Sequence, residues 1–222
     1  MAFAITATLT VVLQASTRER YLAQAPLASV TLESLEVKGK APKSGYSREA
    51  FGPRWADTDR NGCDTRNDVL KRDLAGSLIK TANSNCVVLE GVLQCPYSGE
   101  KIVFRRGSGS SERAQIDHVV SLSNAWQTGM FQRTPAERRH FANDTLNLLA
   151  VKGSLNSQKG DGDAATWLPP RKAYRCEFVA RQLAVKKRYR LWVTPAEKAT
   201  MLGVLKTCPN QRIPTDRIAV ST

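Results

Sequence analysis

The stretch AQIDHVVSLSNAW, residues 114–126, lies in the middle of the chain and contains one of only two histidines in 222 residues. Apolar, β-branched residues flank the adjacent Asp117 and His118, so QIDHVVSL is predicted to be a strand. SNAWQTG should follow as a short helix that ends at Gly129. A chain with 33 Lys and Arg residues therefore places an imidazole beside a carboxylate within a strand. An imidazole of ordinary pKa, about 6.5, can accept a proton at physiological pH.

This pair has two interpretations. A lone histidine among Val and Ile is more often a hydrogen-bonded core residue than a catalyst, and Asp117 could be a surface acid. Downstream, however, Asn147 and Asn156 lie nine residues apart, and Lys159 follows them. Taken singly, these could be turn formers and a solvated loop residue. Their order favours a catalytic unit, in which an Asp-His strand and an Asn-bearing segment lead into a loop and helix.

Capping patterns and apolar periodicity predict helices along the rest of the chain. Asp64 or Thr65 should cap one helix through about residue 74, and Thr134, Pro135 and Glu137 form the start of another. YRCEFVARQLAVKKRYRLW is typical of an amphipathic helix with a basic face, and TPAEKATMLGVLKTC repeats the Thr-Pro-x-Glu start. These helices would surround the Asp-His strand in one domain.

The remaining segments are predicted as strands and loops. NCVVLEGVLQCPYSGEKIVFRRG should form two or three short strands, with turns at Glu90-Gly91 and at Ser98-Gly99. TLNLLAV is a buried strand or leads into a loop, and KGSLNSQKGDG is a loop rich in Gly, Ser and Lys. The chain has no internal repeat and no second block large enough for a separate core. The fold class predicted is α+β, in a single domain.

The domain is expected to occupy residues 47–210, with extensions on both sides. Residues 1–25 are interpreted as a signal peptide or an N-terminal anchor, because an apolar run precedes the small-residue sequence AQA at 23–25. The fit is imperfect, since no Lys or Arg precedes the run and RER interrupts the approach to AQA. Residues 26–46 should be a flexible basic linker and residues 211–222 a C-terminal tail.

Charge and cysteine content restrict the class of protein further. The net charge of +13 and a pI of about 9.9 favour a polyanionic partner, with nucleic acid first and an anionic cell-surface polymer or lipid second. A cationic surface without a specific partner is the alternative. Five dispersed cysteines contain no CxxC pair, which argues against a zinc knuckle. They are typical of disulfides in an exported protein, although five buried thiols in a cytosolic protein would look the same.

Two long stretches, IDHVVSLSNAWQTG and FANDTLNLLAVKGSLNSQKGDGDAATWLPP, resemble the HNH endonucleases. The likeness is closest to the GmrSD-like C-terminal domains of type IV restriction enzymes, in their exported bacterial branch. RWADTDRNGCDTRNDVLKRDL, CVVLEGVL, PYSGEKIVF and YRCEFVARQLAVKKRYRLWVTPAEKA extend it over about residues 46–208. The resemblance implies an α+β domain built around a ββα-metal (HNH, His-Me) finger with additional helices.

The resemblance also implies a chemistry, the metal-dependent hydrolysis of phosphodiester bonds. His118 would be the general base, and Asn147 would hold strand and loop so that His118 is oriented. Asp117 and Asn156 would bind one divalent metal through oxygen, which suits Mg²⁺ first and Mn²⁺ second. The products would carry 5′-phosphate and 3′-hydroxyl ends. Cleavage is expected to be non-specific, with DNA as the first substrate and RNA as a possible one.

Basic residues are candidates for binding the nucleic-acid backbone, because guanidinium and ammonium groups pair with phosphate. Each could equally be an ordinary surface cation. The candidates are Arg66, Arg113, Lys159, Lys186 and Lys187, with Arg105, Arg106, Arg188 and Arg190 behind them. Trp126 and Trp167 flank the motif and are expected to pack in the core, and His140 is expected to be structural or exposed.

Four cysteines allow three pairings, of which Cys63 with Cys86 and Cys176 with Cys208 are preferred because each pair joins neighbouring segments. Cys95 stands where the exported branch commonly has an acid, so it is expected to be the odd thiol. The protein should be secreted, with membrane contact only if the N-terminal segment is uncleaved. The competing hypotheses are a non-catalytic polyanion-binding protein and a cationic cell-surface protein.

Overall fold

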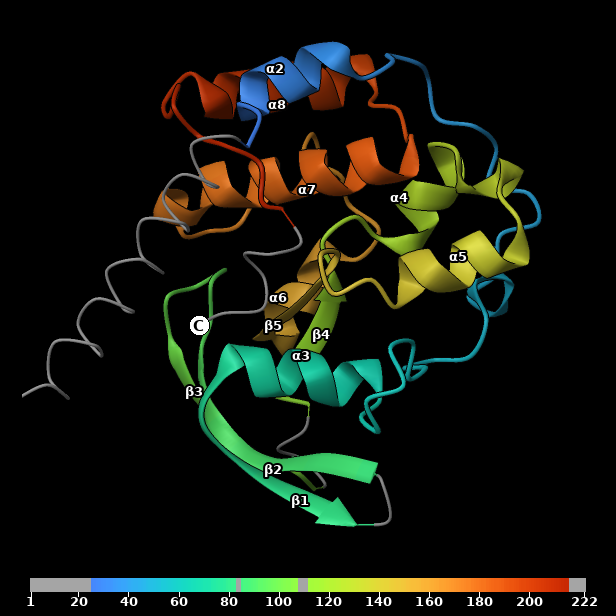
Figure 1. The fold of residues 1–222 in the computed structure, drawn as a ribbon. Coiled ribbons are helices and arrows are strands. Elements are labelled where there is room, and N and C mark those ends of the chain that lie inside the picture. The colour runs from blue at the N-terminus through green and yellow to red at the C-terminus, as the bar shows by residue number, and fades with distance from the viewer. Residues whose placement is uncertain (1–24, 83–84, 108–111, 216–222) are drawn as a thin grey trace, which may run out of the picture.

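The computed structural model describes residues 25–82, 85–107 and 112–215, which form a mixed α+β fold (Figure 1). In chain order its elements are α2 (Ala28–Ser34), η1 (Glu49–Phe51), α3 (Thr65–Asp73), β1 (Leu74–Ala82), β2 (Asn85–Gln94), β3 (Lys101–Arg105), β4 (Ala114–His118), α4 (Leu122–Gln127), η2 (Met130–Gln132), α5 (Pro135–Ala142), β5 (Leu148–Lys152), α6 (Gly153–Lys159), η3 (Lys172–Tyr174), α7 (Arg175–Tyr189) and α8 (Pro195–Leu205).

Two small antiparallel sheets share this fold. The first has the strand order β1-β2-β3, and the second pairs β4 with β5. Helix α3 packs between them, against β1 and β2 on one side and β5 on the other (Figure 1). Helix α7 crosses the opposite side of the β4–β5 hairpin, and α2 and α8 pack on α7. The β4–β5 pair therefore lies in the interior, between a sheet layer and a helix layer, while α6 is buried only at Gly153 and Lys159.

The helix starts follow the predicted capping residues. Asp64 accepts a hydrogen bond from the Asn67 amide at 2.8 Å, so Asp64, and not Thr65, caps α3. Thr134 and Thr194 both form complete capping boxes with the glutamate three residues on. Local sequence is sufficient at these sites because each cap satisfies backbone amides of its own first turn.

The strand predictions around β2 were partly wrong. No turn forms at Glu90-Gly91, since both residues lie inside β2, and β1 was not predicted at all. A Cβ on Gly91 would lie 2.8 Å from Cβ of Leu74 on the paired strand, so glycine permits the close approach of two strands. The turn at Ser98-Gly99 is present, with Gly99 at a φ of +79° and its amide bonded to the Cys95 carbonyl.

Residues 26–46 were predicted to be a flexible linker, but they contain helix α2. Ala28 and Leu32 are completely buried, and Leu27 pairs with Arg212 in an isolated antiparallel bridge. Ile213, from the predicted C-terminal tail, is also buried. The folded body therefore includes both segments, because they cover the apolar surface of α7 and α8. The predicted signal peptide or anchor, residues 1–25, lies outside the described part except for Ala25, which is buried. No helix within the described residues has the length and apolar character of a membrane span.

Disulfides join Cys63 to Cys86 and Cys176 to Cys208, the two pairs that the sequence analysis preferred. The first links the start of α3 to β2, and the second links α7 to the segment after α8. Cys95 is free and buried, as expected of the odd thiol. The two bridges are typical of a protein that matures in an oxidising environment.

Candidate active site

The β4–β5 hairpin brings the Asp-His pair to the end of a strand in the interior. In its register Asp117 lies opposite Leu149 and His118 lies opposite Leu148. Asn147, directly before β5, is completely buried. Its amide oxygen accepts from the Val120 amide at 2.8 Å, and its Nδ2 donates to the Val120 carbonyl at 3.1 Å. These bonds fasten the chain just beyond His118 to the start of β5, which are the contacts expected of Asn147.

Helix α6 follows the hairpin at residues 153–159, where the sequence predicted a loop. The prediction was wrong because it took Gly153 as a loop signal. A Cβ on Gly153 would lie only 2.0 Å from the carbonyl oxygen of Glu112, so glycine is needed for packing at the first position of the helix. The helix ends with Lys159, whose side chain is completely buried. Strands β4 and β5 pair although α4, η2 and α5 lie between them in the chain, and α6 follows β5 directly.

Asp117 is held by two protein groups and is only 4 % exposed. The Lys159 ammonium lies 2.9 Å from Oδ1, and the Tyr97 hydroxyl donates to Oδ2 at 2.6 Å. Lys159 also donates to the His118 carbonyl at 2.9 Å. Burial raises the pKa of the Asp117 carboxyl, and the Lys159 ammonium and the Tyr97 hydrogen bond partly offset that effect. The ion pair therefore fixes the carboxylate beside the histidine.

His118 is 8 % exposed, and its Nε2 lies 2.9 Å from the carbonyl oxygen of Ala142. A carbonyl can only accept, so Nε2 carries the proton and Nδ1 carries the free lone pair. Burial lowers the pKa of His118 to about 3, which keeps the imidazole neutral at physiological pH. The Trp55 ring lies nearly parallel to the imidazole, with ring centroids 6.2 Å apart. The side chain is thus a neutral imidazole with a fixed orientation.

The donor chemistry of Asp117 and Asn156 fits a hard divalent cation. A carboxylate offers about four lone-pair positions, and the two protein contacts of Asp117 use two of them. Asn156 donates through Nδ2 to Gln115 at 2.8 Å, which leaves its amide oxygen as the atom that could bind a metal. Within the described residues, no cluster of three or more His, Cys, Asp or Glu side chains is placed to hold a metal. Oxygen donors of this kind suit Mg²⁺ better than zinc.

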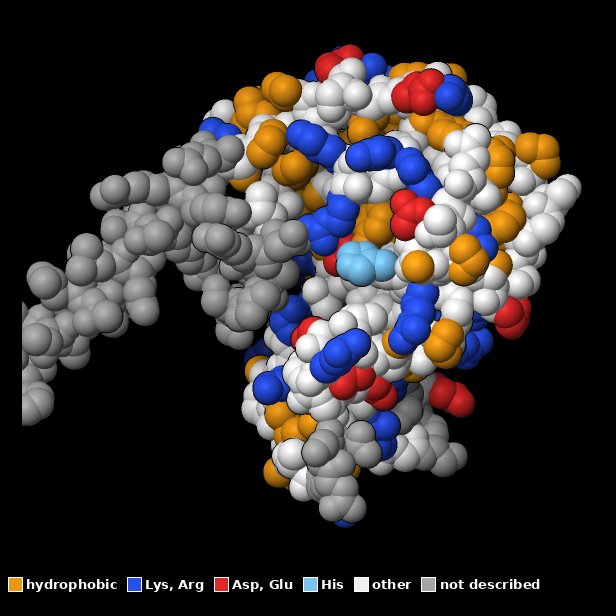
Figure 2. Space-filling model, turned by 45° about the vertical axis from the view of Figure 1, so that its right-hand side comes forward, with side chains coloured by type: hydrophobic (Ala, Val, Ile, Leu, Met, Phe, Trp, Pro, Cys, Tyr) orange, Lys and Arg blue, Asp and Glu red, His pale blue; other side chains and the backbone are white. Residues whose placement is uncertain are grey.

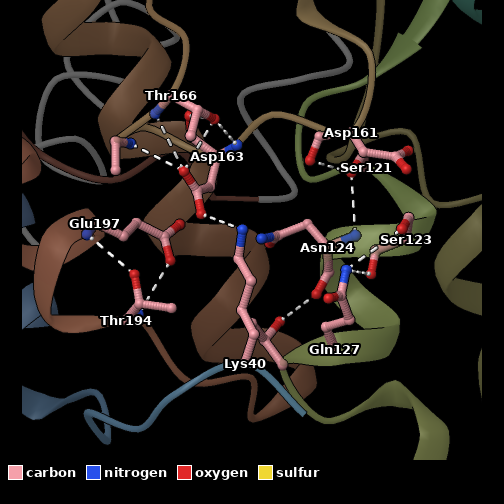
Figure 3. A network of polar contacts seen from close by, with 12 residues as sticks. Lys40, Ser121, Ser123, Asn124, Gln127, Asp161, Asp163, Thr166, Thr194 and Glu197 are labelled. Carbon is pink, nitrogen blue, oxygen red and sulfur yellow. Dashed lines mark hydrogen bonds and ion pairs between the residues drawn. The ribbon is translucent and has the colours of Figure 1, made fainter. Parts of the chain in front are cut away.

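Lys186 was predicted to bind the nucleic-acid backbone, and this prediction was wrong. Its side chain is completely buried and its ammonium lies 3.1 Å from the Glu197 carboxylate. It also contacts Asn124 and the Trp192 carbonyl, so it joins helices instead of reaching a polyanion. Figure 3 shows the surrounding network, with Lys40 reaching the buried Asp163 at 2.8 Å. The sequence analysis placed Lys186 on an exposed basic face of α7. That placement was wrong because apolar periodicity does not reveal that Glu197 is its buried partner.

The other predicted cations are dispersed over the molecule. Lys187 is exposed on α7, and Arg113 lines an open hollow with Glu112 and Lys152. Arg66 lies over the Phe104 ring, with its guanidinium carbon 6.0 Å from the centroid. The structure does not bring these three together around His118, and Lys159 points to Asp117 instead of solvent. Of the second group, Arg106 donates to Asn67 and to the Val88 carbonyl and so supports the fold.

Three residues of the site were missed by the sequence analysis: Arg48, Trp55 and Tyr97. Trp55 packs on His118, Tyr97 bonds Asp117, and Arg48 lies near enough to His118 to influence its charge. Arg48 and Trp55 stand in YSREAFGPRWAD, a segment dense in aromatic and basic residues. The high density of aromatic and basic residues directly before α3 was the sequence signal that could have identified Arg48 and Trp55.

The fold and site define a disulfide-bonded α+β domain with an Asp-His pair at the end of a β-hairpin. The chain belongs to the family of GmrSD restriction endonucleases, C-terminal domain, which matches residues 64–204. It is also 38 % identical over 186 residues to an "Uncharacterized secreted protein" of Arthroderma benhamiae, covering 83 % of this chain and 86 % of the relative. No solved structure matches the chain.

Proposed function

We propose that the protein is an exported, metal-dependent HNH endonuclease that hydrolyses phosphodiester bonds of nucleic acid, with DNA as its first substrate. The observation that carries the proposal is the orientation of His118. Its Nε2 is committed to the Ala142 carbonyl, so Nδ1 is the atom that can accept a proton from water. Membership of a restriction endonuclease family supports the same reaction class.

In the proposed reaction, His118 takes a proton from the water that attacks phosphorus. The Ala142 carbonyl stabilises the imidazolium that forms, because it keeps accepting from Nε2 as Nδ1 becomes protonated. Asn147 keeps the chain after His118 against β5, and so limits the movement of the imidazole. Asp117 adds a negative charge beside the base, held in place by Lys159 and Tyr97.

A divalent metal, held by Asp117 and the amide oxygen of Asn156, would supply charge stabilisation at the phosphate and at the leaving oxygen. Mg²⁺ is the first choice, and Mn²⁺ is the second. For Asp117 to hold it, the Lys159 ammonium must share the carboxylate or withdraw from Oδ1.

The surface charge supports a polyanionic substrate. Figure 2 shows Lys and Arg side chains gathered around a histidine side chain on one face of the molecule. A hollow on α5 and α7 is lined by three arginines against one acid, together with two aromatic side chains: Arg133, Arg188, Arg190, Glu137, His140 and Tyr189. Such charge attracts the nucleic-acid backbone without reading its sequence. Secretion is supported by the two disulfides and by the printed name of the relative.

The proposal is tested by incubating the full chain with supercoiled plasmid, with single-stranded DNA and with RNA. Each substrate is given Mg²⁺, Mn²⁺ or EDTA, and His118→Ala and Lys206→Ala are run in parallel. Cleavage that requires metal, fails in His118→Ala and persists in Lys206→Ala is expected, because Lys206 is an exposed cation that belongs to no part of the proposed site. Nucleic acid that is retarded in a gel by every variant but never cut would instead favour the non-catalytic polyanion binder.

A further inference from the structure

A small hollow is lined by two arginines, Arg48 and Arg54, that no part of the proposed mechanism uses. Trp55 and Ala142 also line it, and its volume of about 10 Å³ accommodates one group of the size of a water molecule or a phosphate oxygen. The Ala142 carbonyl bonds the His118 imidazole, and the Trp55 ring lies nearly parallel to that imidazole. The hollow therefore shares two of its lining residues with the surroundings of the proposed base.

The loop that carries these arginines is fixed to the rest of the protein at several points. Arg138 donates to the Ala50 carbonyl at 2.8 Å, and the Ala56 amide donates to Asn143 at 2.9 Å. Phe51 between them is 1 % exposed and packs on Phe141. Helix α5 and the residue after it form hydrogen bonds to both ends of the loop. The loop therefore has a fixed position relative to the Ala142 carbonyl.

Arg48 is half-buried, and its Nε atom is buried without a hydrogen-bond partner. Arg54 is exposed on the same loop, and within the described part of the chain neither arginine forms an ion pair. Burial and the nearby Arg54 both lower the pKa of Arg48. An unpaired donor in such a place is costly, and it needs an explanation such as a ligand.

Trp55 adds a second unusual feature to the same loop. Its φ of +55° lies in the left-handed region, which a bulky side chain adopts only when the surroundings hold it there. The Trp55 ring is stacked on the His118 imidazole, with ring centroids 6.2 Å apart. Backbone strain of this kind occurs mostly at binding and catalytic sites, and here it occurs in a residue that lines the hollow with the two arginines.

We propose that Arg48 and Arg54 form a binding site for a phosphate oxyanion beside His118, which holds the phosphodiester under attack. The inference rests on the proposed function and names residues that lie before the family match, which starts at residue 64. A guanidinium can donate two parallel hydrogen bonds to one phosphate. Because negative charge grows on the phosphate oxygens as water attacks, such donors would favour the transition state more than the bound substrate.

The test compares wild type with Arg48→Gln, Arg54→Gln and Arg48→Lys in the full chain. Lys206→Gln is the matched control, since it removes one exposed charge beyond α8. Arg48→Gln should lower kcat for DNA cleavage by about 10²–10³-fold with a smaller change in KM, as expected for the loss of a charge-stabilising donor. Arg48→Lys should recover part of the rate, and Lys206→Gln should stay within about twofold of wild type.

A second readout does not depend on cleavage. Inorganic phosphate and a short DNA duplex are each titrated into every variant in EDTA, with binding followed calorimetrically and folding checked by circular dichroism. Both ligands should bind wild type and Lys206→Gln, and both should bind Arg48→Gln at least tenfold more weakly. If the duplex alone shows this dependence, the site takes its phosphate from the nucleic-acid backbone; if inorganic phosphate shows it equally, free phosphate is a ligand too.

The outcomes separate this inference from the proposed function. Wild type that binds duplex through Arg48 but cuts nothing would contradict the nuclease and leave the anion site standing. Cleavage by Arg48→Gln at the rate of Lys206→Gln, with unchanged phosphate binding, would overturn the anion site and leave the nuclease standing. Should Arg48→Gln fail to fold, Arg48→Lys and Arg54→Gln decide, because the site requires each to weaken phosphate binding relative to Lys206→Gln.

Discussion

Replacing Asn147 with Ala should destabilise the protein far more than the loss of a single side-chain contact. Asn147 is completely buried, and its amide satisfies both the amide and the carbonyl of Val120. The substitution leaves two buried backbone groups without partners, at about 1–3 kcal/mol for each. The free energy of unfolding should therefore fall by roughly 2–6 kcal/mol, which is a large fraction of the stability of an ordinary domain.

The assay is equilibrium unfolding in urea with intact disulfides, followed by tryptophan fluorescence and circular dichroism. The transition midpoint should fall while the m-value stays constant, because the surface exposed on unfolding is unchanged. Asn156→Ala is the matched control: Asn156 is half-buried and its amide bonds one side chain, Gln115, so a loss below about 1 kcal/mol is expected. An Asn147→Ala midpoint equal to that of Asn156→Ala would refute the role assigned to the Val120 bonds.

Three further predictions concern other buried groups. Lys159→Met leaves the Asp117 carboxylate buried without its cation, so the free energy of unfolding, measured in urea, should fall by about 3–5 kcal/mol. The control Lys187→Met removes an exposed cation and should cost about 0.5 kcal/mol or less. Equal losses in the two variants would contradict the buried ion pair. The folded pKa of His118, about 3, lies below its unfolded value of 6.5, so the unfolded chain binds more protons between these values. Stability should be complete above pH 6.5 and should fall by up to roughly 4 kcal/mol as the pH drops toward 3, and a His118→Asn variant with the same pH slope as wild type would show that the histidine is not the cause. Cys95 is buried and is the one cysteine outside the two disulfides. A thiol reagent should therefore label one site per chain after unfolding and essentially none before it. Rapid labelling of the native protein would contradict the burial of Cys95.

Local signals predicted the helix starts and the strand that carries Asp117 and His118. Thr134 and Thr194 cap their helices because the groups that each cap satisfies lie within three residues along the chain. Asn147 was predicted to support His118 from its place in the motif, and its bonds to Val120 agree with that role. These features depend on sequence neighbours or on spacing within one motif, which is why reasoning from the sequence reached them.

Features that depend on distant partners were not predicted. Lys159 was expected to contact phosphate, but it pairs with Asp117, 42 residues earlier in the chain. Lys186 was expected on a basic surface, but the acid that buries it belongs to the following helix. Gly153 was taken as a loop residue, whereas its lack of a side chain permits contact with the Glu112 backbone. In each case the environment of the residue is set by a partner that the sequence alone does not place beside it.

The central claim is that His118 is the general base of a metal-dependent nuclease. The most direct measurement is the single-turnover rate of plasmid cleavage in Mg²⁺ by wild type and His118→Ala, with DNA affinity measured in EDTA for both. Loss of a general base should reduce the rate by at least about 10²-fold while the affinity stays within a few-fold. A rate within a few-fold of wild type, at equal affinity, would show that His118 does not take the proton.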